Sequence, residues 1–167
     1  MMLEHVQRMS RYNRWANVRL YGACAALADG EFEQRRPAFF RSISGTLNHL
    51  LVTDRMWIDR LDGRPFVGGK LDDQPFPGLA GLRAARLALD EEIVALASSF
   101  DAGRLAGTTT YRMQTRPEDR TVPTALCWLH MFNHQTHHRG QVHDQLSQTQ
   151  VPPPALDLIY MVYEEMN

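Results

Sequence analysis

The sequence predicts an all-α protein, an antiparallel four-helix bundle, formed as one domain over residues 1–167. Apolar residues recur at steps of three and four along four long segments, a pattern typical of helices that bury one face. Segments rich in glycine and proline separate them. With 167 residues and 44% hydrophobic content, the chain can form one substantial core but not two.

The first predicted helix covers about residues 3–28, and its apolar stripe contains one polar residue, Asn13. The second begins near Ser42 or Ser44, either of which can cap a helix, and ends near residue 62. Its inward stripe includes Asp54, where burial predicts a salt bridge. His49 lies instead on a second apolar strip, so we expect this helix to be contacted on two sides.

The second helix also has a predicted polar face, formed by Asn48, Arg55, Asp59 and Asp62. Residues 63–78 hold four glycines and three prolines, which predicts a long loop.

The third helix is expected near residues 79–100, with Arg86 and Asp90 as an exposed pair four residues apart. Residues 103–123 favour a short β-hairpin, with Arg116 to Glu118 between its strands. The fourth helix spans about residues 123–146, and a short last helix covers about 155–163.

Composition argues against partners that are selected by bulk charge. The net charge is −1, from 18 basic and 19 acidic residues, so we expect no nucleic acid or membrane partner. The arginines around Tyr12 and Trp15 offer a nucleic-acid face as an alternative, but such a face is usually only solvated. Two cysteines far apart, no signal peptide and no membrane-spanning run predict a cytoplasmic protein.

The most informative stretch is HMFNHQTHHRGQVH, residues 130–143, which holds five of the seven histidines. Two imidazoles four residues apart on a helix can bind one metal ion, because one turn brings both rings together. His134 belongs to both possible pairs, with His130 or with His138. The alternative is that these are core or surface histidines with hydrogen-bond partners.

A third ligand is expected from another helix, because bundles build metal sites from facing helices. His49 is the natural candidate, since an imidazole without a partner among apolar neighbours would be costly. His5 is predicted to be solvated. Three neutral imidazoles suit Zn²⁺ or Ni²⁺ and leave a position for water or substrate.

Three stretches of the chain resemble the DinB/YfiT-like metalloenzyme superfamily, in particular its DinB family. They are RYNRWANVRL (residues 11–20), SISGTLNHLLVTDRMWIDRL (42–61) and HMFNHQTHHRGQVHDQL (130–146). The resemblance implies a four-helix bundle, usually dimeric, with one divalent metal ion. It also implies that the metal ligands are His49, His134 and His138, so that His130 and His137 are excluded.

Relatives of this kind include thiol-dependent transferases and isomerases, so the resemblance implies a metal that activates a low-molecular-weight thiol, or water. The residues that could hydrogen-bond to the metal ligands or contact substrate are Asn13, Asp54, His137, Arg139 and Gln141, because metal-bound imidazoles need partners for their other nitrogen. We expect Arg139 to be solvated or at an interface. The sequence identifies no general acid or base. The alternative function is a dimeric interaction or stress-response module with a structural metal.

Overall fold

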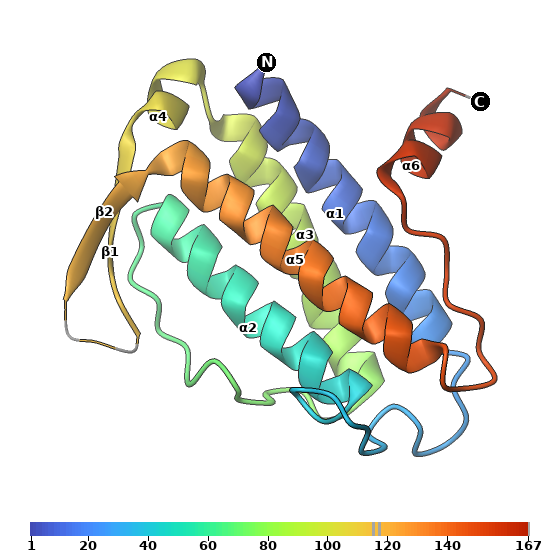
Figure 1. The fold of residues 1–167 in the computed structure, drawn as a ribbon. Coiled ribbons are helices and arrows are strands. Elements are labelled where there is room, and N and C mark those ends of the chain that lie inside the picture. Colours follow the sequence, from blue (N-terminus) through green and yellow to red (C-terminus); the bar gives the residue numbers. More distant parts are fainter. Residues whose placement is uncertain (115, 117, 167) are drawn as a thin grey trace.

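A computed structural model describes residues 1–114, 116 and 118–166 (Figure 1). Its four long helices are α1 (Met2–Cys24), α2 (Ile43–Leu61), α3 (Leu79–Ser99) and α5 (Thr124–Leu146). They form a bundle in which α1 and α2 each pack against both α3 and α5. The predicted all-α four-helix bundle is therefore confirmed, and each long helix lies within a few residues of its predicted limits. None of the helices within the described residues is long and apolar enough to cross a membrane.

The helix directions differ from a strictly antiparallel order. The pairs α1–α3 and α2–α5 are antiparallel, whereas α2 and α3 run in the same direction (Figure 1). The physical reason is the long loop between Leu61 and Leu79, which returns along the length of the bundle before α3 begins. This loop passes over the side of α2 that faces away from α1.

Four shorter elements complete the fold. Helix α4 (Ala102–Ala106) was not predicted. Strands β1 (Thr108–Arg112) and β2 (Asp119–Pro123) pair antiparallel, with Thr108 opposite Pro123, and confirm the hairpin. The segment between the strands contains residues 115 and 117, which lie outside the described residues. Helix α6 (Leu158–Glu165) packs on α1, where Met161 contacts Tyr12 and Ala16.

Helix α2 begins where Ser42 accepts a hydrogen bond from the Gly45 amide at 2.9 Å, so the predicted cap is confirmed. All of its residues except Arg55 are buried, because α3 and α5 cover one side and the loop covers the other. The predicted polar face is therefore wrong for Asp59, which is 8% exposed, and for Asn48, which is 0% exposed. Its amide donates to the Phe76 carbonyl at 2.9 Å and accepts from the Phe76 amide at 3.0 Å, fixing the loop to the helix.

Candidate metal centre

Three histidines from two antiparallel helices converge on one point. His49 comes from the second turn of α2, and His134 and His138 come from successive turns of α5. The Nε2 atom of His134 lies 3.3 Å from that of His49 and 3.1 Å from that of His138. Ligand atoms placed tetrahedrally at zinc–nitrogen distances are about 3.3 to 3.4 Å apart. Among the described residues, these three form the one group of histidine, cysteine or acidic side chains whose geometry could hold a metal ion.

The hydrogen bonds made by Nδ1 of His49 and of His138 determine which ring nitrogen carries the proton. The Nδ1 atom of His49 is 2.7 Å from the Leu71 carbonyl, which can only accept. The Nδ1 atom of His138 is 2.7 Å from Oε1 of Gln141. Both Nδ1 atoms must therefore carry the proton, and both Nε2 atoms direct a lone pair toward His134. This is the tautomer that metal ligation through Nε2 requires.

Burial keeps the three imidazoles neutral. His49 and His138 are each 7% exposed, and His134 is half-buried. Burial, followed by the neighbouring His138 and His49, lowers the pKa of His134 to about 3. Burial lowers the pKa of His138 to about 4 although its bond to Gln141 opposes the shift, and it also lowers the pKa of His49. At neutral pH no proton competes with a metal ion for these nitrogens.

Phe40 covers one side of the cluster. Its ring stacks on His49 with centroids 4.0 Å apart and meets the edge of His138 at 5.5 Å. The chain reaches this position through Arg41, whose φ of 66° lies in the left-handed region. A Cβ atom at Gly45 would lie 2.3 Å from the Phe40 carbonyl oxygen, so only glycine permits this close approach to α2.

The remaining histidines of α5 lie beside the cluster. His137 is exposed and its Nε2 is 3.1 Å from Nε2 of Gln141, so a hydrogen-bonded chain runs from His137 through Gln141 to His138. His130 is exposed and packs on Trp57, with its ring centroid 6.0 Å from that of His134. The spacing argument left His130 and His138 open as the partner of His134, and the geometry groups His138 with it.

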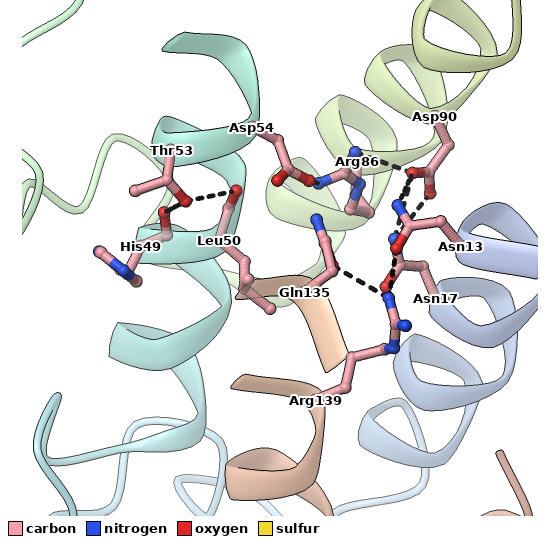
Figure 2. Close-up of polar contacts among 10 residues, drawn as sticks. All are labelled: Asn13, Asn17, His49, Leu50, Thr53, Asp54, Arg86, Asp90, Gln135 and Arg139. Atoms are coloured by element: carbon pink, nitrogen blue, oxygen red, sulfur yellow. Dashed lines mark hydrogen bonds and ion pairs between the residues drawn. The ribbon is translucent and has the colours of Figure 1, made fainter. Parts of the chain in front are cut away.

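Asn13, Asp54 and Arg139 lie in a separate buried network, and none has a described contact with the three histidines. His49 leaves α2 on the side away from this network (Figure 2). Arg139 donates to Asn13 and, at 3.1 Å, to Gln135. It is 2% exposed, so the prediction of a solvated or interface arginine is wrong. The reason is that α1 supplies buried amides opposite it, a contact that the sequence of α5 alone does not reveal.

Arg86 links the same network to α2. It pairs with Asp54 at 2.7 Å and with Asp90 at 2.8 Å, and all three side chains are at most 2% exposed (Figure 2). The predicted salt bridge of Asp54 is confirmed, whereas the prediction of an exposed Arg86–Asp90 pair is wrong. Burial raises the pKa of Asp54, and Arg86 opposes that shift. Asn17 adds two hydrogen bonds to Asp90 at 3.1 Å.

Sequence reasoning missed three residues that shape the centre, namely Phe40, Asn48 and Leu71. Asn48 gave the one usable signal, since asparagine is unfavourable inside a helix unless its amide has a specific partner.

Neither cysteine offers a nucleophile, because Cys24 and Cys127 are buried. Burial raises the pKa of both thiols, and that of Cys24 to about 12.

Three imidazole nitrogens converge in the neutral form that divalent metal ions bind, so these histidines could hold such an ion. A search of curated proteins found no match to the chain. A family model, the DinB family, matches residues 2–166, which is nearly the whole chain. The protein therefore belongs to the DinB family.

Proposed function

We propose that this protein is a divalent-metal-dependent enzyme whose ion is held by His49, His134 and His138. The observation that carries the proposal is the convergence of three Nε2 atoms, two of them with the tautomer fixed by Leu71 and Gln141. Zinc or nickel fits the all-nitrogen donor set. Three protein ligands leave a coordination position for an exogenous molecule, which is the arrangement of catalytic rather than structural sites.

When bound, such an ion would lower the pKa of a coordinated water or low-molecular-weight thiol and so supply a nucleophile near pH 7. The proposed reaction is a thiol S-transfer or isomerisation, or a hydrolysis, of a small-molecule substrate. Phe40 and Leu71 would orient the His49 ring, and Gln141 would hold the proton on Nδ1 of His138. Phe40 would also keep water from one side of the ligand cluster.

The alternative proposal is a dimeric interaction or stress-response module with a structural metal. The large hydrophobic core supports the catalytic role, because burial of apolar side chains can stabilise the fold without an ion. A structural metal normally replaces a core that is too small to fold alone, as in small zinc domains. Among the described residues, 25 buried apolar side chains form one continuous cluster, which favours a fold that is stable without an ion.

Metal analysis tests the proposal. Protein purified without a histidine tag should contain about one zinc or nickel ion per chain. His49→Ala, His134→Ala and His138→Ala should each lose the ion and keep the helical spectrum, whereas His130→Ala and His137→Ala should retain it. A chain that binds no metal, or whose variants unfold on losing it, contradicts the catalytic proposal. A screen of thiols with electrophilic acceptors then distinguishes thiol from water as the nucleophile.

We also propose that the protein acts in the cytoplasm as a homodimer, as the family resemblance implies. Sedimentation equilibrium measures the mass directly, and a monomer at micromolar concentration would contradict the dimer.

A further inference from the structure

A second site lies beside the proposed metal centre. The turn at residues 36–39 and the outer side of α5 enclose a cavity of about 410 Å³. Arg36, Phe39, His137, Gln141, Asp144 and Gln145 are among the residues that line it. The lining combines apolar surface with one cation, one anion and several amides, so it offers charged groups of both signs to a ligand.

The cation of this wall is buried and has no acidic partner. Arg36 is 8% exposed, and within the described residues no carboxylate lies within ion-pair distance of it. Its guanidinium donates to the carbonyls of Glu31 at 2.7 Å and Gln34 at 3.1 Å, and to Oε1 of Gln34 at 3.5 Å. A guanidinium has five N–H donors, so donors and a full positive charge remain for a ligand.

The opposite charge lies on α5. The Asp144 carboxylate accepts a hydrogen bond from Gln148 at 3.3 Å, and no cation of the described chain pairs with it. Arg36 and Asp144 therefore line one cavity without pairing with each other. Two unpaired opposite charges on one wall are complementary to a ligand that carries both charges.

The supporting turn is held in one conformation. The Arg36 amide donates to the Arg41 carbonyl at 2.6 Å, and the Arg41 amide donates to the Ala38 carbonyl at 2.9 Å. The close contact of Phe40 with Gly45 then fixes the turn against α2. The wall is therefore pre-formed, and binding does not have to order it.

We propose that this cavity binds the zwitterionic α-amino-acid group of a small molecule. Its carboxylate would face Arg36, and its ammonium group would face Asp144. Gln141 belongs both to the wall and to the hydrogen bond with His138, so the bound group lies next to a proposed metal ligand. The proposal does not depend on a bound metal, because none of these wall residues is a proposed ligand.

Ligand titration followed by NMR tests the assignment, with L-glutamine as the probe. The full chain should bind L-glutamine saturably with a Kd of roughly 0.1 to 10 mM, with backbone shifts confined to residues 36–41 and 137–148. N-acetyl-L-glutamine lacks the ammonium group and L-glutaminamide lacks the carboxylate. Each should bind at least about tenfold more weakly, because each leaves one wall charge unpaired.

The Asp144→Asn variant separates the charges without disturbing the turn, because Asp144 is exposed on α5. It should bind L-glutamine about as weakly as wild type binds N-acetyl-L-glutamine. His143→Gln, on the neighbouring position of α5, is the matched control and should bind like wild type. Equal binding of the three probes, an unchanged Asp144→Asn variant, or no saturable binding up to about 100 mM overturns the proposal.

Binding is expected both with zinc and with a chelator present. Failure of L-glutamine to bind would leave the metal proposal intact, and loss of metal from the His134→Ala variant would leave this cavity intact.

Discussion

Replacing His134 by glutamine should change the pH dependence of stability in the metal-free protein. The ordinary pKa of histidine is about 6.5, whereas burial lowers that of folded His134 to about 3. Between these values the unfolded chain binds a proton that the folded chain does not, so stability falls as the pH falls below 6.5. At pH 5 the difference for this one group is about 2 kcal/mol. His134→Gln removes this contribution.

Urea unfolding at pH 7.5 and pH 5.0, with a chelator present, measures the effect. The loss of unfolding free energy on acidification should be smaller in His134→Gln than in wild type by up to about 2 kcal/mol. His5→Gln, on an exposed part of α1, controls for the removal of a histidine from the chain. An equal acid-induced loss in wild type and His134→Gln would refute the claim that the folded cluster excludes protons.

Three further predictions concern the network, the cover and the metal. Arg86→Met leaves Asp54 and Asp90 buried without a cation and should cost about 3 to 5 kcal/mol of unfolding free energy. Arg83 is exposed on the same helix, so Arg83→Met should cost almost nothing, and equal losses for the two variants in urea unfolding would contradict this. Phe40→Ala should weaken zinc binding about tenfold or more, because it frees the His49 ring. Phe39→Ala removes an 84% exposed ring and should leave zinc binding unchanged; competition with a chromogenic chelator measures the zinc affinity of both variants. Free zinc at 100 times its Kd should raise the unfolding free energy by about 2.7 kcal/mol, reversibly with a chelator, and an unchanged thermal midpoint would count against the site.

The periodicity of the sequence was sufficient to locate the four long helices and the hairpin. It could not give the direction of α3, because a loop of this length permits either direction and its glycines and prolines carry no directional information. It also missed α4, which is only five residues long and has no apolar repeat.

The histidine spacing identified His134 and required a ligand from another helix, and the burial pattern of α2 identified His49. The environment of those ligands depends on contacts between distant segments. Phe40 reaches His49 only because Gly45 lacks a side chain, and Leu71 reaches it only because Asn48 fixes Phe76. These dependencies join residues 5 to 28 positions apart, which helical periodicity does not encode.

The same limit explains the error at Arg86 and Arg139. The sequence of its own helix predicts that each arginine reaches solvent, as arginines on helix surfaces usually do. In the folded bundle Asp54 of α2 meets Arg86, and Asn13 of α1 meets Arg139, each across a helix interface. A buried charge becomes acceptable when another helix supplies its partner, so this kind of burial can be inferred only once the helix pairing is known.

The separation of the two polar clusters bears on the function. The network around Arg86 lies inside the bundle and connects α2 with α3, while His49 faces the opposite side of α2 (Figure 2). Fold stability and ligand geometry therefore depend on different residues. Loss of a histidine ligand should reduce metal binding with little effect on folding, and loss of Arg86 should do the reverse. If the metal were structural, histidine variants would instead unfold in the way that Arg86→Met does, so comparison of the two variants in one unfolding experiment distinguishes the two functions.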